Sequence, residues 1–156
     1  MYDVKHDGRH KARLVAGGHL TETPTYSVSS SVATLRGLRL ILFVAELNNL
    51  KVWTTDVGNA YLEAYTQEKV YIGGGPEFRD RGGHVMLIKR ALYGLRSSGL
   101  MWWDRCSEIL SSLGFKGSRA ENDIWMRRVG NHYEYICGTW TILESRLRIW
   151  RRLSTS

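Results

Sequence analysis

The chain has 156 residues, a length typical of one domain or of a piece of a larger one, and 43% of its residues are apolar, enough to bury a core. Its 22 Lys and Arg residues against 15 Asp and Glu residues give a net charge of +7, which favours a polyanionic partner. Two distant cysteines argue against a disulfide framework and a zinc site, and the polar N-terminus and short apolar runs argue against a signal peptide or a membrane span, so we expect an intracellular protein.

The first 16 residues are predicted to form a hairpin, with a turn at Asp7 and Gly8 and a second strand over residues 11–15. That strand carries two cations, Lys11 and Arg13. They suit a phosphate chain, but taken alone the pattern favours the solvated face of an edge strand.

A helix is predicted over about residues 32–48, with N-caps offered by the serines at 29–31. Apolar residues recur there at helical spacing and predict a stripe that faces the core. The stripe consists of Val32, Leu35, Leu38, Leu42 and Ala45.

An apolar-rich extended run that begins at Leu50 ends in Asp56, and a small-residue turn and an aromatic follow it. A carboxylate at the mouth of a sheet is well placed to hold a divalent cation, whereas a lone aspartate more often caps a turn or forms an ion pair. Asp56 is the first candidate for a functional residue.

Strands are then predicted over residues 69–72 and 84–88, and a helix over about residues 98–113 with Gly114 as its stop. Backbone amides at the start of that helix can bind an anion or a base edge; the alternative is a plain N-terminus capped by Ser97 or Ser98. A hairpin is predicted over residues 123–129 and 132–137, and the basic residues 138–156 show no strand alternation.

In their order and spacing, the motifs resemble the reverse transcriptase of copia-type LTR retrotransposons. They are Lys-Ala-Arg-Leu-Val-Ala at 11–16, Thr-Leu-Arg at 34–36, Asp-Val-Gly-Asn-Ala-Tyr-Leu at 56–62, Glu-Lys-Val-Tyr-Ile at 68–72, Ala-Leu-Tyr-Gly-Leu-Arg-Ser-Ser at 91–98, Ser-Leu-Gly-Phe-Lys at 112–116 and Asn-Asp at 122–123. The resemblance implies an α+β fold with the fingers and partial palm of a right-hand polymerase, in which an antiparallel sheet packs on helices.

The resemblance also implies roles for individual residues. Asp56 would be the first of three carboxylates that bind two Mg²⁺ ions. The partners would be an RNA or DNA template–primer and deoxynucleoside triphosphates, and the place of action the cytoplasm, within a virus-like particle. The residues implied for the nucleotide pocket are Lys11 and Arg13 at the triphosphate, Ala60 and Tyr61, with Asn59, at the sugar, and Tyr93, Gly94 and Arg96 beside the templating base and nucleotide.

The second acidic motif of that family, Tyr-Val-Asp-Asp, is absent. It should follow residues 135–137, where the chain instead reads Gly-Thr-Trp-Thr-Ile over residues 138–142. Those residues can be encoded GGT ACG TGG ACG ATT, and dropping the first two bases gives TAC GTG GAC GAT, which spells the missing motif. We therefore divide the chain into a fingers and palm fragment over residues 1–137 and a divergent basic tail over residues 138–156 that is read out of frame.

The sequence thus predicts a reverse transcriptase domain by family that is inactive in this chain, because the second and third metal carboxylates are missing. One alternative is a non-catalytic, basic remnant that binds nucleic acid. The other is a decayed, unstable fragment, whose palm sheet would lack its central pairing and leave an exposed edge.

Overall fold

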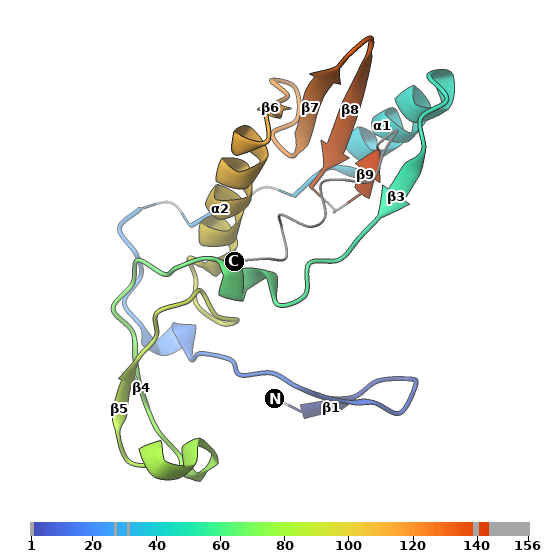
Figure 1. The fold of residues 1–156 in the computed structure, drawn as a ribbon. Coiled ribbons are helices and arrows are strands. Elements are labelled where there is room, and N and C mark those ends of the chain that lie inside the picture. The colour runs from blue at the N-terminus through green and yellow to red at the C-terminus, as the bar shows by residue number, and fades with distance from the viewer. Residues whose placement is uncertain (1, 27, 31, 139–140, 144–156) are drawn as a thin grey trace. The chain divides into compact units, whose positions relative to one another are not determined.

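A computed structural model describes residues 2–26, 28–30, 32–138 and 141–143 (Figure 1). The chain forms two compact units, the first of Met1–Ser29 with Asn59–Trp103 and the second of Ser30–Gly58 with Asp104–Ser156. Helices and antiparallel strands are both present, so the predicted α+β class is confirmed.

The first unit contains two short antiparallel strand pairs, β1 (Tyr2–Val4) with β2 (His10–Ala12) and β4 (Tyr71–Gly73) with β5 (Val85–Leu87). Turns of 3₁₀ helix lie at Gly18–Leu20, Ala60–Glu63 and Pro76–Arg81, the last at the tip of the β4–β5 hairpin (Figure 1). The strand predicted over residues 11–15 ends early, at Ala12, because the chain leaves the hairpin and its Ala16 N–H donates to the carbonyl of Tyr93 at 2.7 Å.

The second unit contains a five-stranded antiparallel sheet in the order β3-β9-β8-β7-β6. Its strands are β3 (Val52–Thr54), β6 (Lys116–Gly117), β7 (Ile124–Val129), β8 (His132–Cys137) and β9 (Thr141–Leu143). The predicted hairpin is β7–β8, paired from Ile124 opposite Cys137 to Val129 opposite His132. Its turn places Gly130 at φ +60°, a conformation that glycine adopts without a steric cost.

Strand β9 corrects the prediction for the C-terminal residues. We expected no strand after residue 137 and a sheet without its central pairing, yet Thr141–Leu143 pairs with both β3 and β8. The sheet is therefore continuous, and the argument for an unstable fragment that rested on missing pairing is wrong. The prediction failed because three residues are too few to show alternation. Residues 139–140 and 144–156 of the predicted tail lie outside the described residues.

Helix α1 (Leu35–Leu47) begins later than predicted. Its N-cap is Thr34, whose Oγ1 accepts a hydrogen bond from the Gly37 N–H at 3.0 Å, so the serines at 29–31 do not cap it. Thr34 Oγ1 also donates to Glu121 Oε1 at 2.8 Å, which fixes the start of the helix next to the loop before β7.

The buried face of α1 is also rotated relative to the prediction. Gly37, Ile41 and Ala45 are buried, whereas Leu35 is 61% exposed and Leu42 41% exposed. Apolar residues occupy more than one face of this helix, so periodicity alone could not select the inner one. Gly37 selects it, because a Cβ at this position would lie only 3.2 Å from Ile124 Cδ1 and the helix can therefore approach the sheet closely.

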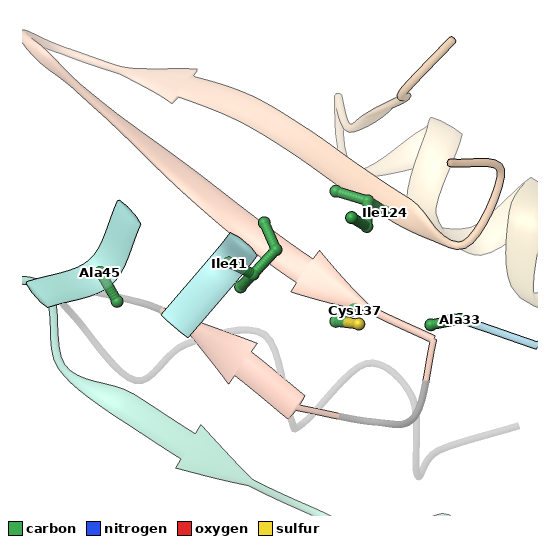
Figure 2. Close-up of a cluster of buried hydrophobic side chains, with 5 residues drawn as sticks. All are labelled: Ala33, Ile41, Ala45, Ile124 and Cys137. Carbon is green, nitrogen blue, oxygen red and sulfur yellow. The ribbon is translucent and has the colours of Figure 1, made fainter. Parts of the chain in front are cut away.

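The core of the second unit lies between α1 and the sheet (Figure 2). Ile41 and Ala45 of α1 pack with Ile124 of β7 and Cys137 of β8, and Ala33 closes the cluster just before the helix. On the hairpin, Arg127 donates to Glu134 Oε2 at 2.5 Å and to the Leu113 carbonyl at 2.8 Å, which joins the end of α2 to the sheet.

Helix α2 (Ser98–Ser112) closely matches the helix predicted over residues 98–113. Helical spacing predicts one apolar face with Trp103, Cys106, Leu110 and Leu113, and of these Cys106 and Leu110 are buried. Met101 and Trp102 are buried as well. Gly114 follows at φ +85°, which confirms the predicted stop.

Cys106 gives the folded chain a pH dependence at alkaline pH. Burial raises the pKa of its thiol from 9.0 to about 12, and the nearby Asp123 charge adds to the shift. Between these values the unfolded chain has lost a proton that the folded chain keeps, so the free energy of unfolding should fall by about 1.4 kcal/mol per pH unit above about pH 9. Urea unfolding across this range measures the slope, and Cys106→Ala should remove this contribution. Equal slopes in the two proteins would contradict it.

Candidate functional site

Residues 91–98 form a turn that holds separate segments of the first unit together. The Tyr93 carbonyl accepts the Ala16 N–H at 2.7 Å, and the Ala91 N–H donates to the Ala64 carbonyl at 2.9 Å. Ala16, Ala64 and Ala91 are all buried, so these backbone hydrogen bonds are shielded from water. The turn therefore joins the segment after β2 to the segment after the Ala60–Glu63 turn.

The side chains of the two serines in this turn, Ser97 and Ser98, form hydrogen bonds within the fold. Ser98 Oγ accepts the Leu92 N–H at 3.0 Å and donates to the Leu92 carbonyl at 2.6 Å, and Ser97 Oγ donates to the Glu68 carboxylate. Both serines are buried. Their hydroxyls thus fix the loop that enters α2, where we had considered them as caps.

Gly94 and Arg96, both predicted for the nucleotide pocket, lie where the turn over residues 91–98 packs against the backbone of residues 16–23. Gly94 has φ +95°, and a Cβ there would collide with the Ala16 carbonyl, 3.0 Å from its carbon and closer still to its oxygen. The Arg96 guanidinium donates to the Gly18 carbonyl at 3.3 Å and to Thr23 Oγ1. These contacts hold the turn against residues 16–23.

Three of the predicted pocket residues lie in direct contact. The Tyr61 and Tyr93 rings are 4.7 Å apart between centroids and tilted by 57°, and the Arg13 Cζ lies 5.6 Å from the centroid of Tyr93. This geometry is typical of aromatic and cation–π contacts. The structure therefore brings Arg13, Tyr61 and Tyr93 together from three separate motifs.

The remaining predicted pocket residues lie close by in sequence. Ala60 is half-buried and begins the 3₁₀ turn that carries Tyr61, after Asn59 at φ 54°. Lys11 is half-buried in β2, opposite Asp3 and two residues before Arg13.

A groove of about 580 Å³ lies beside this turn, lined by residues 21–26 and 67–71. Tyr26 and Tyr71 are exposed along it, together with Lys69. Exposed aromatic rings with a cation are a combination that can stack on unpaired bases.

Asp56 belongs to the second unit, where it is exposed two residues beyond β3. Strand register shows what shares its edge of the sheet. Thr54 pairs with Thr141, Thr141 with Cys137, and Cys137 with Ile124. Asp56, Gly138 and Asp123 therefore all lie at the same edge.

Asp123 is a carboxylate to which the sequence reasoning gave no role. It is 5% exposed, its carbonyl accepts the Gly138 N–H at 2.7 Å, and a Cβ on Gly138 would lie 2.9 Å from its own Cβ. Its place in the Asn-Asp motif, at the first residue of a predicted strand, was the signal that could have identified it.

The described residues do not fit a magnesium site. Among them, no three His, Cys, Asp or Glu side chains come close enough to hold one ion. Asp56 is exposed, and Asp123 is buried beside Gly138. Within the described part of the chain, no helix is both long and apolar enough to cross a bilayer.

A family model described as reverse transcriptase (RNA-dependent DNA polymerase) matches residues 1–141. The truncated transposon Ty1-A Gag-Pol polyprotein of Saccharomyces cerevisiae is 32% identical over 112 residues, which are 70% of this chain and 9% of that polyprotein. The transposon Ty1-DR4 Gag-Pol polyprotein of the same yeast is 32% identical over 112 residues, 70% of this chain and 7% of that protein. The retrovirus-related Pol polyprotein from transposon RE1 of Arabidopsis thaliana is 29% identical over 133 residues, 82% of this chain and 9% of that protein.

The chain therefore spans less than a tenth of the length of each of these three curated relatives. No solved structure matches it.

Proposed function

Because the chain belongs to the reverse transcriptase family, in the copia-type branch that its motifs predicted, we propose that it is a piece of an RNA-directed DNA polymerase comprising the fingers and part of the palm. The observation that carries this proposal is the contact of Arg13, Tyr93 and Tyr61, three residues from separate family motifs. In this proposal the first unit carries the residues implied for the nucleotide, and the second unit carries Asp56.

In this proposal cationic side chains bind the phosphates of the incoming nucleotide, and packing contacts select its sugar. Lys11 and Arg13 neutralise the triphosphate, and Ala60 and Tyr61 contact the sugar. Tyr93 borders the base pair directly. Gly94 and Arg96 contribute by holding the turn that carries Tyr93, as their backbone contacts suggest.

The same proposal makes this chain a binder that does not polymerise. Family members take two magnesium ions between three carboxylates, and the described residues do not offer that set of ligands. We assign residues 138–156 to a reading frame different from that of residues 1–137, because codons permitted for residues 138–142 spell the missing motif in another frame. The nucleotide sequence of codons 137–156, translated in every frame, tests this assignment.

The proposed partners follow from the family and from the charge of +7. They are an RNA or DNA template–primer and deoxynucleoside triphosphates, and the groove beside the turn offers Tyr26, Tyr71 and Lys69 to an unpaired strand. The proposed place of action is the cytoplasm, as the resemblance to the family implies.

Binding to a template–primer duplex is expected to weaken steeply with salt, because each cation that contacts a phosphate releases a counterion. Lys11→Ala and Arg13→Ala should each weaken binding and lower the slope of log K against log salt by about 1. Fluorescence anisotropy of a labelled duplex at several salt concentrations measures both quantities.

Arg39→Ala is the matched control, since Arg39 is an exposed cation on α1 of the second unit. It should leave the salt slope unchanged. Affinity that ignores salt, or an equal loss in Arg39→Ala, would refute the proposed phosphate contacts.

A further inference from the structure

We propose that Tyr93 is a positioning residue that couples Arg13 to Tyr61, so that polyphosphate bound at Arg13 changes how the Tyr61 ring is held. The inference rests on the proposed function, which places a triphosphate at Arg13 and a sugar at Tyr61. It adds a connection between these two ends of the nucleotide, through a side chain that the resemblance placed beside the templating base and nucleotide.

The side-chain evidence is that one ring makes both contacts. Tyr93 lies 4.7 Å from the Tyr61 ring centroid, and its own centroid lies 5.6 Å from Arg13 Cζ. Tyr93 as a whole is 36% exposed, so it is accessible to solvent although its ring has neighbours on two sides. A polyphosphate that binds Arg13 neutralises part of its charge and so weakens its attraction to the face of the Tyr93 ring. Because Tyr61 packs against that same ring, the packing of Tyr61 should change as well.

The backbone evidence is that hydrogen bonds hold the segments that carry Arg13, Tyr61 and Tyr93. The Tyr93 carbonyl accepts the N–H of Ala16, three residues after Arg13, so this backbone hydrogen bond holds the segment that carries Arg13 next to Tyr93. On the other side, the Ala64 N–H donates to the Tyr61 carbonyl at 3.0 Å, and the Ala64 carbonyl accepts the Ala91 N–H at 2.9 Å. Tyr61 also packs against the buried cluster that contains Ala64 and Ala91.

The functional consequence concerns the choice of sugar. If the Tyr61 ring is held tightly only when a triphosphate is bound at Arg13, then the sugar of a nucleotide is selected after its phosphates have bound. Discrimination between deoxyribose and ribose would then depend on Tyr93 although Tyr93 itself need not contact the sugar.

The test follows the Tyr61 ring directly and needs no polymerisation. The full chain is prepared with 3-fluorotyrosine at position 61, and its fluorine NMR signal is recorded while tripolyphosphate is added. Phosphorus NMR line broadening reports independently whether tripolyphosphate binds. Tyr93→Leu and Tyr93→Met remove the ring, and Tyr93→Phe keeps it.

The chain offers a matched control in a second pair of the same chemistry, because the Arg90 guanidinium lies 4.0 Å from the Tyr65 ring. Tyr65→Leu removes that contact and leaves Tyr93 in place. Having two ring-less variants keeps the test valid if one of them does not fold, which circular dichroism reveals.

Tripolyphosphate is expected to shift the fluorine signal in the parent chain, in Tyr93→Phe and in Tyr65→Leu. The shift should be lost in Tyr93→Leu and Tyr93→Met while phosphorus line broadening persists. An equal shift in the ring-less variants, or no shift in the parent chain while tripolyphosphate binds, would overturn the coupling alone. Absence of tripolyphosphate binding to the parent chain would overturn the proposed triphosphate site and the coupling with it.

Discussion

Gly94→Ala is expected to lower the free energy of unfolding by about 4 kcal/mol. A loss of this size is typical of substitutions that overpack a site and also strain the backbone. Two costs add. The backbone at φ +95° is strained for any residue with a Cβ, and the new methyl group would overlap the Ala16 carbonyl and lie 2.9 Å from Val15 Cγ1. Relief requires the loss of the hydrogen bond between Ala16 and Tyr93. Chemical denaturation, followed by circular dichroism, measures the loss.

Gly83→Ala separates these two costs. Gly83 belongs to the same unit and has φ +77°, but nothing lies within 4 Å of the position that its Cβ would take. We expect a loss of only about 1 kcal/mol there, from backbone strain alone. Equal losses in the two variants would show that the close packing at Gly94 contributes little to stability.

Primer extension by this chain is expected to stay at background with either magnesium or manganese. Phosphoryl transfer by a two-metal mechanism needs ligands for both ions, and polymerases of this kind depend on them for most of their rate. Asp56 is exposed at the edge of the sheet, and the described residues supply no set of three ligands around it. An intact primer after long incubation, resolved on a denaturing gel, is the expected result.

Asp56→Asn provides the control for that experiment. Because the parent chain should already be inactive, the substitution is expected to leave the background unchanged and to leave duplex binding within about twofold, since Asp56 adds no favourable charge to a polyanion. Templated DNA synthesis that Asp56→Asn abolishes would show that the metal site is complete after all.

Local signals explain which elements could be predicted. The β7–β8 hairpin surrounds a Gly-Asn turn, and Gly114 follows the end of α2, so each element has its own boundary signal in the sequence. Helix α1 has no such boundary, because three serines precede the threonine that caps it. Strand β9 exists through pairing on both of its sides, which no property of three residues reveals.

The candidate site divides in the same way. Family motifs identified Arg13, Tyr61 and Tyr93, but their contact depends on backbone hydrogen bonds between segments that are far apart in the chain. The buried position of Asp123 likewise follows from the β7–β8 register, and spacing alone could not give it. Motif order therefore predicted which residues to expect at the site, and long-range pairing determined what each of them contacts.

The turn over residues 91–98 also determines where the first unit should resist hydrogen–deuterium exchange. The amides of Ala16 and Ala91 donate to carbonyls inside the fold, and both residues are buried although neither lies in a helix or a strand. The strands β1, β2, β4 and β5, by contrast, are three residues long and largely exposed. Slow exchange in this unit should therefore be concentrated in irregular backbone, and its regular strands should exchange early.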